Sequence, residues 1–402
     1  MPPLRATFEG RRVVLAGAVA TAWSEHIALL RSLGATDVMV IATEGRGGGR
    51  QPDVPTVIVE PPARLPVMDS IRFGDRLLAS PTAEMLDALA AFDPDRSAVT
   101  IGTFLNTTPE LDGRPFLAAR RPHWEALEDK VVVDAFWDRA GIDRQPSLVV
   151  PRDEAAAAAS ALDRGNGTVW AADARDGVHG GGSQTYWVTD EASAALADRA
   201  LADVCDLVRV MPFLDGIPCS IHGIVMPDGV VVLRPVEMVT LRSDNRFVYA
   251  GCATFWDPAP DVRAQMRSVA RRVGHRLQAE IDFRGTFTVD GVVTDTGFWP
   301  TELNPRFGAG IMTIGRAADI PMVLLHHLIA GGRTLGRSAT QVEHDLLIAA
   351  DLHRGGGTWK GGFGGAFEAI DRPISQTTTG EWEWATGSTS ASAAVTAGAG
   401  FI

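Results

Sequence analysis

The sequence predicts a mixed α/β fold, and the start of the chain carries much of that prediction. Residues 12–16 form an apolar run typical of a buried strand, and residues 37–41 form a second one. Between them, residues 20–33 show the apolar spacing of a helix that ends at Gly34. A strand, a helix and a strand in this order predict a parallel sheet. We therefore expect a Rossmann-like N-terminal domain.

The glycines of this predicted domain do not complete a dinucleotide site. The segment Leu-Ala-Gly-Ala-Val-Ala, which begins at Leu15, falls short of Gly-x-Gly-x-x-Gly, and the glycine cluster at residues 45–49 follows the second strand. A scaffold without a cofactor is therefore favoured. Residues 98–103 predict a further strand that leads into Asn106-Thr107-Thr108. Ligands tend to bind at that end of a parallel strand, so a role of undefined type is possible there.

Length, charge and cysteine content narrow the class of protein. A chain of 402 residues has room for two or three domains, and its net charge of −12 argues against a nucleic-acid partner or an anionic membrane surface. No apolar run approaches the roughly 18 residues of a spanning helix, and the N-terminus lacks the apolar core of a signal peptide. Cys205, Cys219 and Cys252 lack metal-site spacing, so we expect reduced core residues in a cytoplasmic protein.

One short segment, Thr-Glu-Leu-Asn-Pro-Arg-Phe-Gly-Ala-Gly, carries most of the functional signal. Its Glu302 and Asn304 are two positions apart and therefore point to one face of a strand. A carboxylate and an amide oxygen on one face suit Mg²⁺. Arg306 follows the proline that must end the strand, and Gly308 and Gly310 let the backbone approach a ligand. These groups together indicate a site for phosphoryl groups, although a polar edge strand with a glycine-rich turn would give the same pattern.

An aspartate upstream strengthens the prediction of a metal site. Residues 284–290 predict a strand, Asp290-Gly291 is a turn signal, and the chain returns through a second turn at residues 295–297. Asp290 therefore ends one strand, and Glu302 lies on a later, adjacent one. Asp290, Glu302 and Asn304 are expected to converge on one cation or on two. The alternative for Asp290 is an ordinary turn residue.

This pattern, Arg-Gly-x-x-x-Val-Asp followed twelve residues later by Glu-x-Asn-Pro-Arg, resembles the ATP-grasp ligases over about residues 115–350. Within that superfamily the chain looks most like peptide ligases of the pheganomycin type, which carry a distinct pre-ATP-grasp domain and act in natural-product biosynthesis. The resemblance implies a Rossmann-like domain at 1–115, linker helices and a small lobe with a Gly-rich lid at 116–210, a large lobe with the metal site at 211–352, and a C-terminal extension at 353–402.

The resemblance also assigns a role to Lys130, one of only two lysines in the chain. Residues 125–140 have helical periodicity and stop at Gly141. In ATP-grasp enzymes a lysine at this point reaches the ATP phosphates. The alternative is a solvated helix lysine.

The predicted lid departs from the family pattern. Residues 168–188 read as strand, Gly-rich loop and strand, and the backbone of Gly180, Gly181 and Gly182 would cradle phosphate and close as a lid. The lysine that many relatives place before this loop is absent. Arg175 would supply the charge instead, or His179 a donor. A Gly-rich loop without a ligand is the alternative.

Four residues further along are assigned to the nucleotide and the substrate. The backbone at Met211 and Phe213 would meet the adenine edge, although both also suit an ordinary core. Glu237 would assist metal or ribose binding. Arg242 would pair bidentately with the acid substrate. A surface ion pair is the alternative for both Glu237 and Arg242.

The resemblance implies an ADP-forming ligase that uses ATP and Mg²⁺ to join small-molecule amino acid or peptide substrates through an acyl phosphate, with Arg306 and Lys130 as catalytic groups. No nucleic-acid or membrane partner is expected, and a homodimer is possible. A decayed nucleotide-binding or regulatory protein is the competing reading, and a nicotinamide oxidoreductase lacks its glycine fingerprint. We expect residues 355–402 to pack onto the ATP-grasp core, with Trp382 and Trp384 burying apolar area.

Overall fold

The computed structural model divides the chain into two compact units. Residues Met1–Arg120 and Thr358–Ile402 form the first unit, and Arg121–Gly357 forms the second. Among the described residues, no helix is both long and apolar enough to span a membrane. The structure describes residues 2–45, 52–63, 65, 67–175, 177, 180, 182–243, 245–358, 370–377, 382–384 and 393–397.

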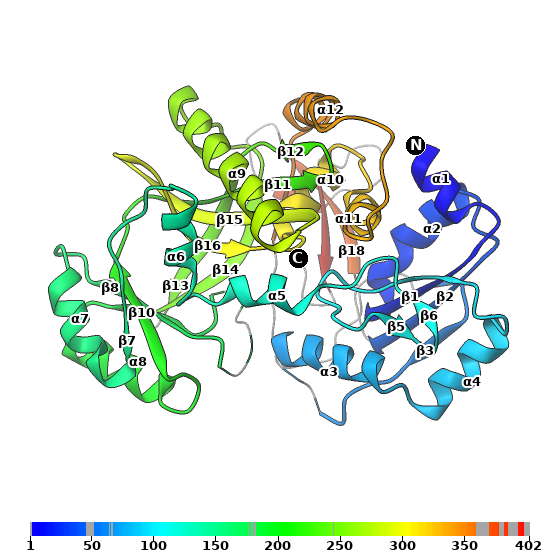
Figure 1. Cartoon of the computed structure of the whole chain (residues 1–402), viewed down its shortest axis with the longest axis horizontal. Coiled ribbons are helices and arrows are strands. Elements are labelled where there is room, and N and C mark those ends of the chain that lie inside the picture. The colour runs from blue at the N-terminus through cyan, green and yellow to red at the C-terminus, as the bar shows by residue number, and fades with distance from the viewer. Residues whose placement is uncertain are drawn as a thin grey trace. The chain divides into compact units, whose positions relative to one another are not determined.

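The first unit contains the parallel sheet that the sequence predicts. Its strands lie in the order β3-β2-β1-β4, and every pairing is parallel. Apolar side chains from β1 and β2 pack with those of α3 and α4 into one core (Figure 1). The elements are α1 (Pro2–Phe8), β1 (Arg12–Val19), η1 (Ala20–Trp23), α2 (Ser24–Ser32), β2 (Asp37–Glu44), β3 (Thr56–Ile58), α3 (Val67–Ala79), α4 (Ala83–Phe92), β4 (Val99–Ile101), β5 (Glu110–Leu111) and β6 (Arg114–Pro115).

The loop after β4 uses its polar side chains internally. Asn106 is buried, its Nδ2 donates to the carbonyl of Thr108 at 2.9 Å, and its Oδ1 accepts from the Thr108 N–H at 3.1 Å. Arg120 N–H donates to the Asn106 carbonyl at 2.7 Å. These bonds give Asn106 a role in shaping the loop.

The second unit is built on one long sheet, and the pairings along its main path are antiparallel. Its main path runs β16-β15-β11-β13-β14-β9-β8-β10-β7, with β12 paired to β11 and β17 paired to β14. Its elements are α5 (Pro122–Glu125), η2 (Ala126–Glu128), α6 (Val133–Arg139), β7 (Leu148–Pro151), η3 (Arg152–Glu154), α7 (Ala155–Leu162), β8 (Thr168–Ala172), β9 (Thr185–Val188), α8 (Glu191–Leu201), β10 (Leu207–Pro212), β11 (Ile217–Met226), β12 (Gly229–Val232), β13 (Val236–Ser243), β14 (Arg246–Ala253), α9 (Pro260–Ile281), β15 (Gly285–Thr294), β16 (Gly297–Asn304), α10 (Ala309–Ala317), α11 (Met322–Ala330), α12 (Ala339–Leu352) and β17 (Gly356–Thr358).

The two ends of this sheet form two lobes with separate cores. In the small lobe, α7 and α8 pack against β10 and β9. In the large lobe, the long helix α9 packs on β11, β12, β15 and β16 (Figure 1). The three cysteines are free and buried, as the sequence predicts.

The turn predicted at Asp290-Gly291 was wrong. Asp290-Gly291 is not a turn, because β15 runs on to Thr294 and only a bulge separates the two residues. A Cβ on Gly291 would lie 2.4 Å from the Trp299 carbonyl oxygen and 2.5 Å from the Phe298 ring, so this glycine allows close strand packing.

The C-terminal segment contributes a small separate sheet. β18 (Ile370–Gln376) pairs with β19 (Trp382–Trp384) and β20 (Ala393–Ala397), both antiparallel. The side chains of Trp382 and Trp384 lie outside the described residues. The contact grouping places Thr358–Ile402 in the first unit and not with the core that the sequence predicted as its partner.

Candidate functional site

A row of polar residues crosses three adjacent strands at the centre of the large lobe. Asp290 on β15 lies directly opposite Glu302 on β16, and on its other side it lies opposite Ser220 on β11. Asn304 lies opposite Thr288, one side-chain repeat further along. The hairpin β15–β16 therefore brings the two predicted carboxylates and the predicted amide to one face.

Hydrogen bonds hold these groups together. Asn304 Nδ2 donates to Asp290 Oδ2 at 2.9 Å, and Ser220 Oγ donates to Asp290 Oδ1 at 2.5 Å. Arg306 Nη2 donates to Asn304 Oδ1 at 3.0 Å. The convergence predicted from Asp290, Glu302 and Asn304 is thus present in the structure, whereas Ser220 carried no signal in the sequence.

The electrostatics of the row suit a divalent cation. Burial, followed by the nearby carboxylate of Glu302, raises the pKa of Asp290 to about 7, while Ser220, Arg306 and Lys130 act in the opposite direction. Two carboxylates in contact resist ionising together, and a bound cation removes that penalty. Within the described residues no group of three or more His, Cys, Asp or Glu side chains is placed so that it could hold a metal ion. Two carboxylates and an amide nevertheless fit Mg²⁺, which keeps several waters and takes further oxygens from a phosphate substrate.

The raised pKa predicts how stability depends on pH without metal. Folded Asp290 binds its proton up to about pH 7, whereas the unfolded group releases it near its ordinary value of 3.8. The folded state therefore holds more protons between about pH 4 and pH 7, and its free energy of unfolding falls as pH rises through that window. We expect the melting temperature in EDTA to show this fall, and Asp290→Asn to lack that component. If the melting temperatures of the two proteins changed in the same way with pH, the raised pKa of Asp290 would be contradicted.

Lys130 reaches this row from a turn and not from the predicted helix. The predicted helix at residues 125–140 is broken between η2 and α6, where Asp129 Oδ1 accepts from the Val131 N–H at 3.1 Å. An Asp side chain bonded to its own downstream backbone favours a turn over a helix. Lys130 Nζ lies 3.2 Å from Glu302 Oε1, and the Lys130 side chain is 10% exposed. Its reading as a solvated helix lysine is therefore wrong.

Arg306 follows the end of β16, and its guanidinium contacts both Glu128 and Asn304. Its Nε lies 3.0 and 3.1 Å from the two carboxylate oxygens of Glu128, a buried residue of η2. Burial alone would lower the pKa of Arg306, but the carboxylates of Glu128, Glu302 and Asp290 together raise it above its ordinary value. Sequence reasoning missed Glu128, and its only signal was an acid two positions before Lys130.

Gly308 and Gly310 lie at the start of α10, where they let the helix approach the sheet closely. A Cβ on Gly308 would lie 2.4 Å from Thr288 Oγ1, and a Cβ on Gly310 would lie 2.2 Å from His222 Nε2. His222 is buried on β11, its Nδ1 lies 2.9 Å from Thr288 Oγ1, and burial lowers its pKa to about 3. What these glycines approach in the structure is protein, so their predicted substrate role stays a prediction.

This packing predicts that Gly310→Ala is destabilising. The new methyl group would overlap a neutral imidazole that has no room to move, because His222 is 1% exposed. We expect a loss of about 1–3 kcal/mol in the free energy of unfolding, measured by denaturant titration. Gly357→Ala is the control, because a Cβ there meets no atom within 4 Å. Equal stability of the two variants would contradict the packing argument.

Of the predicted adenine and acid residues, Phe213 and Arg242 meet in an aromatic cluster. Met211 is buried on β10, and Phe213 follows that strand. The Arg242 guanidinium lies 4.8 Å from the ring centre of Trp187 and 5.6 Å from that of Phe213, and the two rings are 4.9 Å apart. Arg242 is six residues along β13 from Val236, which pairs with Ser220, so it lies about 20 Å along the strand from the carboxylate row. Arg242 thus lies in a cation–π contact.

Glu237 is closer to the carboxylate row. It is half-buried on β13 and lies opposite Cys219 on β11, next to Ser220. Neighbouring residues of a strand point to opposite faces, so the register places Glu237 on the face opposite to Ser220 and the carboxylate row. Its predicted assistance to metal or ribose stays a prediction.

The predicted lid follows β8 and precedes β9. Arg175 is exposed and forms an ion pair of 2.9 Å with Asp206, and it also bonds the carbonyl of Asp203. Gly182 has a φ of +82°, and a Cβ there would lie 2.6 Å from the Phe247 carbonyl oxygen. Gly180 is half-buried. His179 and Gly181 lie outside the described residues.

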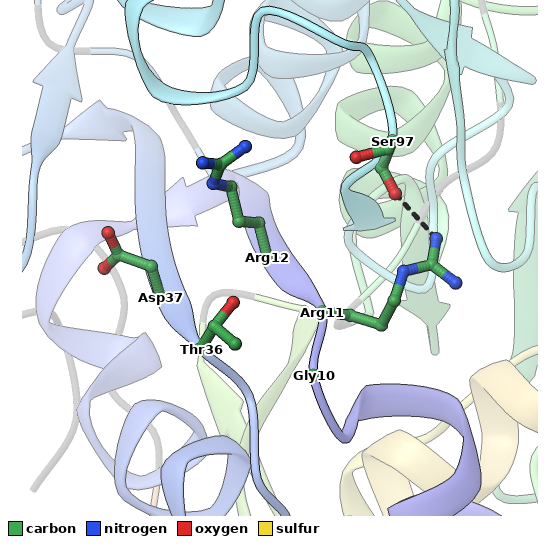
Figure 2. A pocket seen from close by; sticks show the side chains of 6 residues that line it. All are labelled: Gly10, Arg11, Arg12, Thr36, Asp37 and Ser97. Carbon is green, nitrogen blue, oxygen red and sulfur yellow. Dashed lines mark hydrogen bonds between the residues drawn. The ribbon is translucent and has the colours of Figure 1, made fainter.

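A separate pocket lies in the first unit. It has a volume of about 440 Å³ and is lined by Gly10, Arg11, Arg12, Thr36, Asp37 and Ser97 (Figure 2). Arg11 Nη2 donates to the Ser97 carbonyl at 2.6 Å. Because β1 starts at Arg12 and β2 at Asp37, this pocket lies at the amino ends of the strands, opposite to the end where parallel sheets bind ligands. We assign no chemistry to it.

Comparison with known proteins relates part of the second unit to a known family. A family model described as an ATP-grasp domain matches residues 175–310. A search of curated protein sequences gave no match. The chain is similar in structure to the biotin carboxylase domain of the Hydrogenobacter thermophilus 2-oxoglutarate carboxylase, solved with MgADP, ADP and bicarbonate. That comparison has a TM-score of 0.61 and 14% identity, and it covers 91% of this chain and 78% of that chain.

Two ligases are also similar in structure. Phosphoribosylamine–glycine ligase from Thermotoga maritima gives a TM-score of 0.55 and 16% identity over 91% of this chain and 85% of that chain. L-amino acid ligase from Bacillus licheniformis gives a TM-score of 0.56 and 12% identity over 92% of this chain and 84% of that chain. At these identities the likeness shows the fold. Residues 175–310 therefore match an ATP-grasp domain model, and the chain has the two-lobed ATP-grasp fold together with an N-terminal parallel sheet.

Proposed function

We propose that the protein is an ATP-dependent carboxylate–amine ligase that releases ADP. The observation that carries this proposal is the convergence of Asp290, Glu302 and Asn304 with Lys130 and Arg306. The contacts join three oxygen ligands to two permanent cations, which is the set that phosphoryl transfer needs. The two similar ligases, one acting on glycine by its name and one on L-amino acids, support the same reaction class.

Each group has a distinct task in this proposal. Asp290, Glu302 and Asn304 would hold Mg²⁺, which supplies charge neutralisation at the transferring phosphoryl group. The three contacts of Arg306 use its Nε–H and one N–H on each Nη, so the second N–H of each Nη can meet a phosphoryl oxygen. Lys130 supplies an ammonium beside Glu302. Position and charge, and not a side-chain nucleophile, would therefore drive the transfer.

The reaction would proceed in two steps. A substrate carboxylate oxygen attacks the γ-phosphorus of ATP, the bond to the ADP oxygen breaks, and an acyl phosphate forms. An amine then attacks the acyl carbon, phosphate leaves, and the amine loses a proton. The backbone at Met211 and Phe213 and the glycines Gly180, Gly181 and Gly182 are proposed to hold the nucleotide.

The substrates proposed are an amino acid and an amino acid or peptide. The resemblance to pheganomycin-type ligases supports this choice and a role in natural-product biosynthesis. A cytoplasmic location and a homodimer also stay predictions. Incubation with ATP, Mg²⁺ and a pool of amino acids and peptides should release ADP and phosphate, whereas AMP and pyrophosphate would contradict the acyl-phosphate route.

Arg242 as the acid-binding residue stays a prediction, and its geometry favours a different outcome. Its guanidinium stacks on two rings, and it lies far along β13 from the carboxylate row. If it binds the acid, Arg242→Ala should raise the KM of the acid about tenfold or more, and that of ATP much less. Equal effects on both KM values, or no effect, would remove it from the acid site.

A catalytically decayed nucleotide-binding protein is the second candidate. The absent lysine before the lid favours it, and so does Arg175, whose charge is paired with Asp206 in the structure. Titration with ATP and Mg²⁺ separates the candidates. Binding without ADP release from any substrate pool would favour the decayed protein.

A further inference from the structure

Glu128 is a buried acid whose carboxylate faces the guanidinium of Arg306. Its side chain is 1% exposed, and both of its oxygens lie within 3.1 Å of Arg306 Nε. An isolated buried carboxylate is strongly disfavoured, whereas one paired with a guanidinium is compensated. The arrangement therefore requires Glu128 and Arg306 to be charged together.

Arg306 is fixed at three points. Glu128 meets Nε, Asn304 meets Nη2 at 3.0 Å, and the Phe307 carbonyl meets Nη1 at 3.4 Å. A guanidinium is planar, so contacts to all three nitrogens determine its orientation. Of these partners, Glu128 alone carries a negative charge.

Glu128 belongs to the same short segment as Lys130. Glu128 ends η2, and two residues later Lys130 Nζ meets Glu302 Oε1 at 3.2 Å. Glu128 thus pairs with Arg306, and Lys130 pairs with Glu302 on β16. These two ion pairs hold the segment in place against the strand that carries two of the proposed metal ligands.

We propose that Glu128 is a positioning residue, which orients Arg306 so that its outer N–H groups face the γ-phosphoryl group of ATP. The inference rests on the proposed function for the identity of the phosphoryl donor. Glu128 itself does not touch the reacting atoms and acts through Arg306. Its removal should consequently impair the step that involves the γ-phosphoryl group more than the binding of the rest of the nucleotide.

Glu128→Gln tests the inference because it keeps the shape and removes the charge. We expect kcat to fall on the order of 10–100-fold, as for other residues that orient a functional group, with the KM of ATP raised by no more than about tenfold. In an Arg306→Lys background, the same substitution should have almost no further effect on kcat. An undiminished loss in that background would show that Glu128 acts independently of Arg306 and would overturn the inference.

A binding measurement tests the same point without turnover. Calorimetry with Mg²⁺ would compare AMP-PNP, which carries a γ-phosphoryl group, with ADP, which does not. Glu128→Gln should weaken AMP-PNP binding about tenfold relative to ADP binding, and an unchanged ratio would overturn the inference. If the wild-type protein releases no ADP with any substrate pool but the binding ratio shifts as expected, the proposed ligation fails while the positioning role stands.

Two further variants separate orientation from folding. Glu343 is a matched control, because its carboxylate lies between Arg267 at 2.7 Å and Arg271 at 2.8 Å, outside the site. Glu343→Gln should lose stability but keep kcat and the ratio of nucleotide affinities. Should Glu128→Gln fail to fold, Glu128→Asp keeps the charge and draws the carboxylate back by one methylene. The same loss of preference for AMP-PNP is expected from it, and an unchanged preference would count against the inference.

Discussion

Glu302→Gln is expected to lower kcat by on the order of 10²–10³-fold, the cost typical of losing one electrostatic contact made to the transition state. The substitution removes one of two carboxylates from the proposed metal site and keeps the size of the side chain. It also frees Lys130 from its ion pair at 3.2 Å. The concentration of Mg²⁺ needed for half-maximal activity should rise together with the loss of kcat.

The matched control for Glu302→Gln is Glu280→Gln. Glu280 also accepts from a cation, with its oxygens 3.0 and 3.3 Å from Arg139, but it lies on α9 in a pair outside the carboxylate row. Its activity and Mg²⁺ dependence should equal those of the wild-type protein. A Glu302→Gln enzyme with normal kcat and normal Mg²⁺ dependence would show that this carboxylate is not a metal ligand.

Arg306→Lys is expected to lower kcat by about 10³-fold, within the range for arginines that stabilise a transferring phosphoryl group. Lysine keeps the charge but offers no planar fork, so it cannot meet Glu128, Asn304 and a phosphoryl oxygen at once. Because Glu128 is buried, some loss of stability should accompany the loss of rate.

Steady-state kinetics with a check of thermal stability separates these two effects of Arg306→Lys. Arg139→Lys is the control for a loss of guanidinium geometry at an exposed Arg–Glu pair. If Arg306→Lys retained a tenth or more of wild-type kcat, Arg306 would act as a point charge and not as an oriented donor.

The strand pairing of the site could be predicted because it depends on local rules. Glu302 and Asn304 share a face through the two-residue repeat of a strand, and the turn signals at residues 295–297 place Asp290 on the neighbouring strand. The parallel sheet of the first unit followed from the order of its apolar segments.

The remaining features depend on contacts between distant residues. Gly291 looked like part of a turn, but the Phe298 ring and the Trp299 backbone explain why a glycine stands there. Lys130 looked helical because periodicity alone does not show that Asp129 bonds the backbone ahead of it. Ser220 had no signal, and Glu128 had only its place two positions before Lys130, because their partners Asp290 and Arg306 are 70 and 178 residues away. Arg242 could be recognised as a cation, but its aromatic neighbours come from other strands.

The transfer of oxygen from the acid to phosphate tests the proposed reaction most directly. A pool of amino acids labelled with ¹⁸O in the carboxylate would be incubated with the protein, ATP, Mg²⁺ and amine substrates, and the released phosphate analysed by mass spectrometry. An acyl phosphate passes one carboxylate oxygen to the phosphate, so each turnover should yield ADP and phosphate with one ¹⁸O atom. Amide product accompanied by unlabelled phosphate, or by AMP, would contradict the proposed function.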